Sequence, residues 1–261
     1  MFSVVLPCFN EARHGYLPRI LNNLSQQSGD HQLIAVVSPS QDDTLDVIRR
    51  FDRVEIIETV ASNRAQRLNV GIAASQGDMV LLHHPATLLP QKDALLQAET
   101  ALTAAVWGGF VHSFDLDHWL LRFTSWYSTR QRSQRQRILY LDHCIFARRQ
   151  VLTEIGGVPD LDIFEDTALS VALGQWGKPA IAPGKVITSA RRFRSRGIYR
   201  QALLNQLLKV MYHTRLDPKK LNWLYESKSQ INVDYSTSQN GSEFSLESSL
   251  ENADRNDLEV K

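Results

Sequence analysis

The chain has 261 residues, of which 43% are apolar and 22% are charged, the balance of a globular protein with a full core. Its two cysteines, Cys8 and Cys144, exclude a disulfide framework or a zinc site by their number and spacing, and no run approaches the roughly 18 apolar residues that span a bilayer. The net charge of +1 combines 26 basic and 21 acidic residues up to residue 226 with three basic and seven acidic residues after it. We therefore expect a soluble or peripheral protein whose basic body either meets anionic partners or carries surplus solvated arginines.

Strands and helices alternate in the first half of the predicted structure. Short runs rich in β-branched residues predict strands, and amphipathic stretches between them predict helices. The predicted strands are Phe2–Leu6, Leu33–Val37, Val54–Glu58 and Met79–His83, and the predicted helices are Leu17–Gln27, Thr44–Phe51 and Arg64–Ser75. This alternation predicts an α/β fold with a mostly parallel sheet and helices on both of its faces.

The second half of the chain is less regular. An Arg-rich segment from Arg122 to Arg137 lies between the first two of its predicted elements, and the composition shifts to Ser, Asn and acids after Glu226, which predicts disorder. We expect one domain over residues 1–225 and a disordered, acidic, Ser-rich tail over residues 226–261. The predicted elements are the strands Ala105–Val111, Cys144–Arg148 and Ala180–Thr188 and the helices Glu165–Trp176 and Ile198–Tyr212. The last helix is amphipathic, with one apolar face formed by Leu203, Leu204, Leu207, Leu208 and Met211.

A polar pair follows the first predicted strand. The segment Val4–Glu11 reads V-V-L-P-C-F-N-E, so Pro7 closes the apolar run and Asn10 and Glu11 open the loop before the first helix. In open α/β sheets, ligands bind at the carboxyl ends of the strands, and these side chains could hydrogen-bond a base or a ribose. The alternative is an ordinary helix entry with polar capping residues.

A second candidate site lies at the start of the helix predicted from Arg64, in the run N-R-A-Q-R-L-N-V-G. Backbone N–H groups and the helix dipole favour an anion there. An arginine in the first turn can also hold a diphosphate through two parallel hydrogen bonds. The alternative is an arginine on a solvated helix face.

Five motifs, in order along residues 2 to 225, resemble the inverting nucleotide-sugar glycosyltransferases of the family 2 type, which have the GT-A fold. The chain is most similar to a bacterial branch that reads S-V-V-I-P-x-x-N-E, G-R-A-x-Q-M-N-x-G-A…G-D, L-H-A-D-T-x-L-P, M-E-D and S-A-R-R-W/F. The matching segments here are Ser3–Glu11, Asn63–Asp78, His84–Pro90, Phe164–Asp166 and Ser189–Phe193.

The resemblance implies roles for individual residues. Asp166 matches the family's catalytic base, which takes the proton of the acceptor hydroxyl as its oxygen attacks the anomeric carbon; Glu165, the second catalytic candidate, precedes it and points elsewhere on the helix. The alternative is an acidic pair that serves only the helix N-terminus. Arg191 and Arg192 match basic positions that face the diphosphate. The full set of donor-binding candidates is Pro7, Asn10, Glu11, Arg64, Asn69, Arg191 and Arg192.

The chain departs from the family at two positions. Ser38 stands where an Asp binds the base, so that base recognition is weakened or altered. Ala86 stands where an Asp holds a divalent ion against the donor diphosphate, and a methyl group cannot bind a hard cation. The family's use of Mg²⁺ or Mn²⁺ is therefore doubtful here. His84, with His83 and His143, could form a softer imidazole site, or all three could be packing and hydrogen-bonding residues.

These patterns predict an enzyme that transfers a sugar from a nucleotide-sugar donor to an acceptor hydroxyl with inversion. The alternative is a catalytically degenerate member that binds nucleotide, a partner or a membrane without transfer. A nucleic-acid binder that uses the Arg-rich segment 122–149 is disfavoured, because no aromatic platform or known binding motif accompanies that segment.

The expected location is the cytoplasm, with peripheral binding at the inner face of the membrane. Two buried free thiols suit a reducing compartment. Between Lys185 and Lys220, ten basic residues and one acid surround the apolar face of the amphipathic helix, as in helices that bind anionic membrane surfaces. The competing interpretation is that this face belongs to the core and that the arginines serve the diphosphate.

Overall fold

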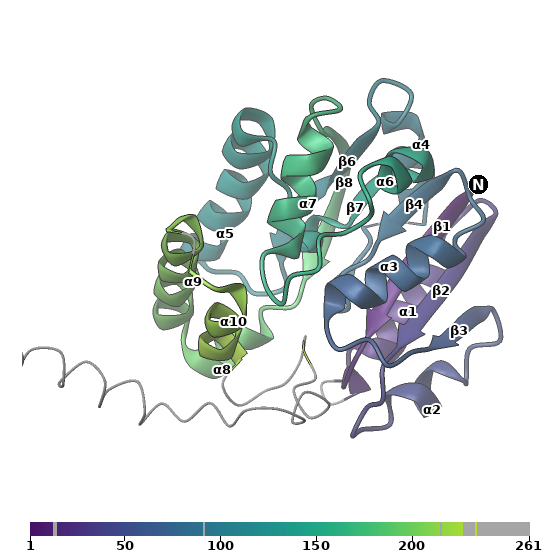
Figure 1. Ribbon diagram of the computed structural model, residues 1–261, viewed down its shortest axis with the longest axis horizontal. Helices are drawn as coiled ribbons and strands as arrows, with labels where there is room; N and C mark the ends of the chain where they lie inside the picture. Colours follow the sequence, from purple (N-terminus) through teal and green to yellow (C-terminus); the bar gives the residue numbers. More distant parts are fainter. Residues whose placement is uncertain (13–14, 91, 215, 227–232, 234–261) are drawn as a thin grey trace, which may run out of the picture.

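A curled sheet runs through the molecule and carries helices on both faces (Figure 1). The computed structural model describes residues 1–12, 15–90, 92–214, 216–226 and 233, and within them the sheet has eight strands in the order β3-β2-β1-β4-β7-β6-β8-β5. The predicted α/β fold is confirmed. The strands are β1 (Phe2–Cys8), β2 (His31–Val37), β3 (Val54–Glu58), β4 (Met79–Leu82), β5 (Thr87–Leu88), β6 (Trp107–Phe114), β7 (Ile145–Arg148) and β8 (Ala180–Thr188).

The first half of the sheet is parallel, and its inner strands β1 and β4 are buried on both faces, whereas the edge strand β3 is partly exposed. β1 pairs with β2 and β4, and β2 pairs with β3, all in parallel. Because successive side chains of a strand alternate between faces, Val4 and Leu6 pack on the side of α1 (Leu17–Ser25), whereas Val5 packs on the side of α3 (Arg64–Ala74). Burial on both faces explains the continuous apolar run of β1. The first side also carries α2 (Thr44–Ile48) and α4 (Ala94–Ala101), and the second carries α6 (Arg149–Glu154) and α7 (Glu165–Gly174).

Antiparallel pairing enters the sheet at β7. This strand runs antiparallel between β4 and β6, while β8 is parallel to β6 and β5 is antiparallel to β8. β6 and β8 approach each other so closely at Gly108 that an added Cβ would lie 2.1 Å from the carbonyl oxygen of Ala180. Because β7 is reversed, the residues before it lie at the same edge as the loops that follow β1 and β4.

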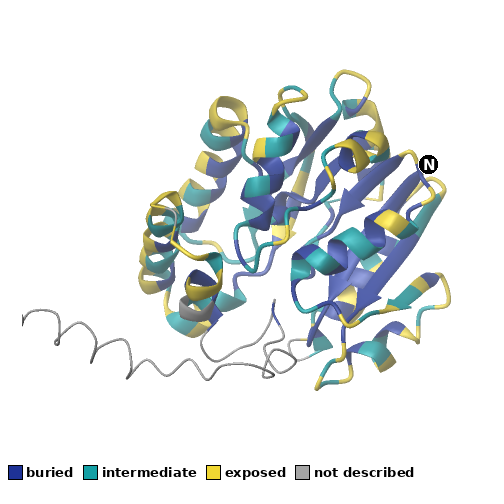
Figure 2. Ribbon diagram, viewed as in Figure 1, coloured by how far each residue is buried: buried dark blue, intermediate teal, exposed yellow. Residues whose placement is uncertain are grey.

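The second half of the described chain adds helices beside this edge. α5 (Trp119–Trp126) continues directly into a π-helix, η2 (Tyr127–Gln136), and the short 3-10 helix η3 (Leu141–His143) precedes β7. α8 (Arg191–Arg196), α9 (Ile198–His213) and α10 (Pro218–Glu226) follow β8. α9 and α5 stand on the same side of the molecule, far from β3, and both carry exposed outer faces (Figures 1 and 2).

The predicted apolar face of α9 is wrong in part. Leu204, Leu208 and Met211 pack inward in a small apolar cluster, whereas Leu203 and Leu207 are 71% and 53% exposed. At 3.6 residues per turn the five predicted positions spread over an arc wider than one interface, and the structure buries only one part of that arc. α9 is therefore apolar both toward the core and toward its surroundings.

Three further expectations concern the whole chain. Cys8 and Cys144 are free and buried, as predicted. Among the described residues, no helix has the length and apolar character needed to cross a membrane. Glu226, assigned to the predicted tail, is the last residue of α10, and the rest of that tail, residue 233 apart, lies outside the described residues.

Candidate active site

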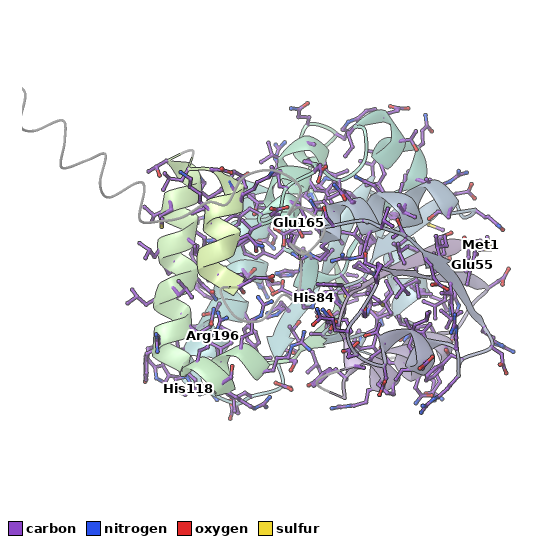
Figure 3. The ribbon with its side chains drawn as sticks, turned by 60° about the horizontal axis from the view of Figure 1, so that its bottom comes forward. Met1, Glu55, His84, His118, Glu165 and Arg196 are labelled. Atoms are coloured by element: carbon purple, nitrogen blue, oxygen red, sulfur yellow. The ribbon has the colours of Figure 1, made fainter. Side chains whose placement is uncertain are left out.

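A cavity of about 270 Å³ lies at the edge of the sheet where β1, β4, β6 and β8 end. This is the edge at which open α/β sheets bind ligands. Side chains reach the cavity from the loops after these strands, from η3, from the start of α7 and from the C-terminal helices. Figure 3 shows two of the residues discussed below, His84 and Glu165, between the sheet and those helices.

Asp166 reaches the cavity from the first turn of α7. Phe164, in the left-handed conformation with φ at 63°, turns the chain into the helix. Oδ2 of Asp166 accepts a hydrogen bond from the backbone N–H of Leu141 at 2.9 Å, and Oδ1 accepts one from the backbone N–H of Thr167 at 2.7 Å. Burial, helped by the negative charge of Glu165, raises the pKa of Asp166 to about 6. The side chain is thus a buried carboxylate whose pKa lies near neutrality.

Glu165 faces away from the cavity, toward α3. Its carboxylate forms an ion pair with Nε of Arg64, the first residue of α3, and its side chain is 1% exposed. Arg64 lines the cavity, whereas Glu165 is not among the described residues that do. The structure therefore places Glu165 against the guanidinium group of Arg64, at the cavity wall, and not in the cavity itself.

Two more arginines line the cavity from the start of α8. Nη2 of Arg191 donates a hydrogen bond to Oε2 of Glu11 at 3.4 Å, and Nη2 of Arg192 lies 3.7 Å from Oε1 of Glu226. The guanidinium carbon of Arg192 also lies 4.6 Å from the ring centroid of Tyr225. Burial raises the pKa of Glu11 to about 7, against the opposing effect of Arg191. Each arginine is therefore held by a buried carboxylate from a distant part of the chain.

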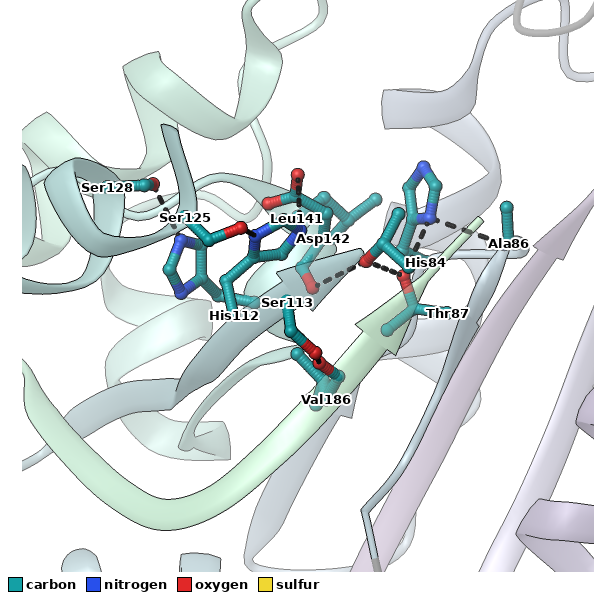
Figure 4. Close-up of polar contacts among 12 residues, drawn as sticks. His84, Ala86, Thr87, His112, Ser113, Ser125, Ser128, Leu141, Asp142 and Val186 are labelled. Atoms are coloured by element: carbon teal, nitrogen blue, oxygen red, sulfur yellow. Dashed lines mark hydrogen bonds and ion pairs between the residues drawn. The ribbon is translucent and has the colours of Figure 1, made fainter. Parts of the chain in front are cut away.

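His84 lines the same cavity as a neutral ring. Its Nδ1 accepts a hydrogen bond from the backbone N–H of Ala86 at 3.2 Å and lies 3.0 Å from Oγ1 of Thr87 (Figure 4). Burial and the positive charges of Arg64 and Arg191 lower the pKa of His84 well below its usual value. Because Nδ1 is an acceptor, the single proton of the ring is on Nε2, which is a hydrogen-bond donor.

The residues at the predicted metal position do not fit a divalent ion. Ala86 has no ligand atom, and Nδ1 of His84 is already occupied by the backbone. His143 does not complete a site, because its ring bonds Oγ of Ser128 at 2.7 Å and a backbone carbonyl at 2.8 Å. His83 is fully buried. Nowhere in the described part of the chain do three His, Cys, Asp or Glu side chains form a group that could hold a metal ion.

Sequence reasoning missed several residues of the cavity wall. Oδ2 of Asp142 lies 3.3 Å from Nε2 of His112, whose Nδ1 bonds Oγ of Ser125 at 3.0 Å (Figure 4). Burial lowers the pKa of His112 to about 4, and burial also lowers the pKa of Lys209, on α9, to about 8. Asp142 precedes a strand, where a parallel sheet places no ligand residues. Only the reversed direction of β7 brings it to this edge.

Three predicted donor-binding residues, Pro7, Asn10 and Asn69, are not among the described residues that line the cavity. Pro7 lies within the buried strand β1. Oδ1 of Asn10 accepts a hydrogen bond from the backbone N–H of Gln41 at 2.7 Å. The amide of Asn69 accepts from the backbone N–H of Val158 at 2.7 Å and donates to its carbonyl oxygen at 2.8 Å. Asn10 thus ties the loop after β1 to the loop after β2, and Asn69 ties α3 to the loop before α7.

Ser38, at the predicted base position, belongs to a buried polar cluster. Its Oγ donates a hydrogen bond to the carbonyl oxygen of Ala61 at 2.6 Å and accepts one from Nη1 of Arg67 at 3.2 Å. Arg67 is 2% exposed, and its guanidinium carbon lies 5.3 Å from the ring centroid of Phe9. A hydroxyl group and a cation thus stand where the motifs predict a carboxylate.

Several solved structures resemble this fold. S. aureus TarS has a TM-score of 0.57 and 14% identity over 87% of this chain and 42% of its own. Residues 1–349 of TarS in complex with UDP-GlcNAc give a TM-score of 0.56 and 15% identity over 72% of this chain and 58% of that one. The mannosyltransferase PcManGT from Pyrobaculum calidifontis, in complex with GDP-Man and Mn²⁺, gives a TM-score of 0.58 and 19% identity over 71% of this chain and 56% of that one. This chain therefore spans about half the length of the proteins it matches, and the likeness shows the fold.

A comparison with curated proteins gives no match. A family model described as glycosyl transferase family 2 matches residues 3–156, which is more than half of the chain. The matched region contains β1 to β4, the arginine at the start of α3 and the loop of His84, and it ends before Asp166. On this evidence the chain belongs to glycosyl transferase family 2.

Proposed function

We propose that the protein is an inverting glycosyltransferase that moves a sugar from a nucleoside diphosphate sugar to an acceptor hydroxyl. The observation that carries the proposal is the meeting of Asp166, a buried carboxylate with a pKa of about 6, with Arg64, Arg191 and Arg192 in the wall of one cavity. The family supports a glycosyl transfer. The complexes of TarS with UDP-GlcNAc and of PcManGT with GDP-Man support a donor of the nucleotide-sugar class.

Asp166 is the base in this proposal. The acceptor hydroxyl gives its proton to the carboxylate while its oxygen forms a bond to the anomeric carbon of the sugar. On the opposite side of that carbon, the bond to the diphosphate oxygen breaks, and the configuration inverts. A pKa of about 6 leaves Asp166 ionised at neutral pH and close to the pKa at which a general base works best.

The arginines stabilise the diphosphate as it leaves. Negative charge develops on the leaving oxygen, and fixed positive groups in a buried site stabilise it without reorganisation. Arg64, Arg191 and Arg192 are such groups, because each is already held by a buried carboxylate. The Nε2–H group of His84 is a neutral donor in the same wall. Glu11, at the end of β1, contacts the donor in addition to holding Arg191.

Replacement of the base tests the function. Asp166→Asn keeps the size of the side chain but cannot accept the proton, so transfer should fall by about two to four orders of magnitude. Thermal shift with UDP and GDP, which reports binding by mass action, should be unchanged. Asp46→Asn, at an exposed carboxylate on α2, is the matched control and should transfer normally.

The same measurements separate the catalytically degenerate alternative, which the substitutions at Ser38 and Ala86 favour. A wild-type protein that shifts its melting temperature with a nucleotide but transfers no sugar from any matching donor would bind without catalysis. Wild-type turnover in the Asp166→Asn variant would instead show that another group takes the proton. The anomeric configuration of the product, read by NMR, tests inversion separately.

We also propose a cytoplasmic location with peripheral binding at the inner face of the membrane. The buried free thiols of Cys8 and Cys144 suit a reducing compartment. The surplus of positive charge between Lys185 and Lys220 suits the anionic surface of that leaflet. Cell fractionation tests the proposal: the protein should sediment with membranes at low salt and be released at high salt, and its presence in the wash at low salt would contradict the membrane part.

A further inference from the structure

Two helices that the cavity separates expose apolar side chains on the same side of the molecule. α5 and α9 each present one such stripe, at helical spacing, and six of the side chains are between 51% and 71% exposed. The six are Trp119, Phe123 and Trp126 on α5 and Tyr199, Leu203 and Leu207 on α9. The stripes meet at Trp119 and Tyr199, whose ring centroids are 6.5 Å apart. We call these six residues the α5–α9 surface; Figure 1 shows the two helices that carry it on the same side of the molecule.

The charge around the α5–α9 surface is mostly positive. The segment 119–136, which forms α5 and η2, contains four arginines and no acid, and the segment 198–213, which forms α9, contains Arg200 and Lys209 and no acid. Arg130 and Arg200 are exposed. Asp117, which pairs with Arg122 just before α5, is the nearest acid in sequence. An apolar stripe with aromatic rings and a basic surround is the composition of surfaces that bind anionic membranes.

The α5–α9 surface borders the mouth of the cavity. Phe123 belongs both to the α5–α9 surface and to the cavity wall, because it is exposed and lines the cavity. On the other helix Gln206, the neighbour of Leu207, is also exposed and lines the cavity. Positive charge continues into the cavity, since Lys209 and Arg132 line its wall and both interact with the charge of Asp166. Whatever covers the α5–α9 surface therefore lies beside these exposed residues of the cavity wall.

We propose that the α5–α9 surface docks on an anionic phospholipid bilayer and so places the mouth of the cavity against the membrane. The exposed tryptophans and tyrosine lie at the headgroup level, the leucines insert below it, and the surrounding arginines meet the lipid phosphates. A second copy of this chain fits less well, because a two-fold interface would place these arginine-rich, acid-free segments against each other. The inference rests on the proposed function in two respects: it assigns the proposed membrane binding to one surface, and it lets the acceptor of the transfer enter from the bilayer.

Vesicle binding by the full chain tests the proposal. We expect the protein to sediment with vesicles of phosphatidylcholine and phosphatidylglycerol at low salt, to bind phosphatidylcholine vesicles much more weakly, and to be released at high salt. Leu203→Glu combined with Leu207→Glu should lower the partition coefficient at least about tenfold. Arg200→Glu should lower it about fivefold or more, since each basic residue near an anionic surface contributes about that factor.

Matched controls come from exposed apolar residues elsewhere. Val60, two residues after β3, and Val171, on α7, are 87% and 58% exposed, and Val60→Glu and Val171→Glu should bind vesicles as the wild type does. Brominated lipids should quench the fluorescence of the bound wild type, and Trp126→Phe should reduce that quenching, whereas Trp176→Phe should not. These measurements need no enzymatic activity, so they stand even where transfer fails.

Three outcomes would overturn the docking proposal. One is equal binding by the wild type and the Leu203/Leu207 double variant. Another is no binding to anionic vesicles at low salt. The last is self-association that the double variant abolishes, which would make the surface an interface between copies. Asp166→Asn should bind vesicles normally, so a failed vesicle experiment and a failed transfer experiment are told apart. Nucleotide-induced thermal shifts of the double variant should match the wild type, because neither leucine lines the cavity.

Discussion

At the scale of single residues, the environment of Asp166 sets the pH range of transfer. Burial and the charge of Glu165 raise its pKa to about 6, so the carboxyl group is protonated and cannot accept a proton below that pH. We expect kcat to rise with the ionised fraction up to about pH 6 and then to level off. Glu165→Gln removes the neighbouring negative charge, and the rising limb should move to lower pH. A pH–rate profile at saturating donor, measured for the wild type and for Glu165→Gln, checks both predictions. If the rising part of the profile lies at the same pH in the two proteins, the charge of Glu165 does not raise the pKa of the base.

The arginines of α8 offer a second test at this scale, because neighbours on one short helix have different surroundings. Arg192 lines the cavity, whereas Arg194 pairs with Asp115 at 3.1 Å and is not among the described lining residues. Arg192→Ala should lose about 2–4 kcal/mol of transition-state stabilisation, the range for one such donor, and Arg194→Ala should lose none. Arg192→Lys should recover only part, since an ammonium group lacks the fork of a guanidinium. Steady-state kcat/KM values measure the effect of all three substitutions. Equal losses for Arg192→Ala and Arg194→Ala would contradict the assignment of Arg192 to the donor site.

At the scale of elements, Asn69 connects α3 to the loop that leads toward α7. Its amide makes two hydrogen bonds with the backbone of Val158. Asn69→Ala should therefore lower the free energy of unfolding by about 1–3 kcal/mol, the range for buried groups left without partners. The affinity for UDP or GDP should not change. Denaturant unfolding and a nucleotide titration separate the two effects, and a weakened affinity with unchanged stability would restore the donor-binding role that the motif predicts.

The helices and strands show how much of the fold the sequence alone could predict. Local patterns predicted β1 to β4 and the helices between them, because each is a continuous run with one period. α5 and η2 were missed: α5 has only eight residues, so its apolar stripe spans barely two turns, and η2 is a polar, Arg-rich segment with no apolar period. The reversed direction of β7 depends on long-range pairing, which no local pattern reports, and Asp142 was missed with it. The partners that hold the arginines, such as Glu226 for Arg192, lie too far away in sequence to be paired by spacing.

At the scale of the whole molecule, each half of the fold provides some of the residues of the candidate site. The parallel half, β1 to β4, provides the loops with Glu11 and His84 and carries Arg64 at the start of α3. The antiparallel half and the helices after it provide Asp166, the arginines of α8 and the mouth of the cavity. Glu165 with Arg64, and Arg191 with Glu11, are ion pairs across this division. The two halves are therefore joined beside the cavity by ion pairs that include Arg64 and Arg191, two of the arginines to which we assign the donor diphosphate.

This division leads to the last prediction: transfer should not require Mg²⁺ or Mn²⁺. Ala86 has no ligand atom and His84 already uses Nδ1, so the stabilisation of the leaving diphosphate falls to guanidinium groups from both halves. Arginine stays charged at any working pH and binds phosphate in a bidentate manner, and the charge opposite the diphosphate is therefore independent of added ions. Turnover of the wild type should survive treatment with a chelator. Loss of turnover that manganese restores would show that a metal still binds, and His84→Ala would then test the imidazole as its ligand.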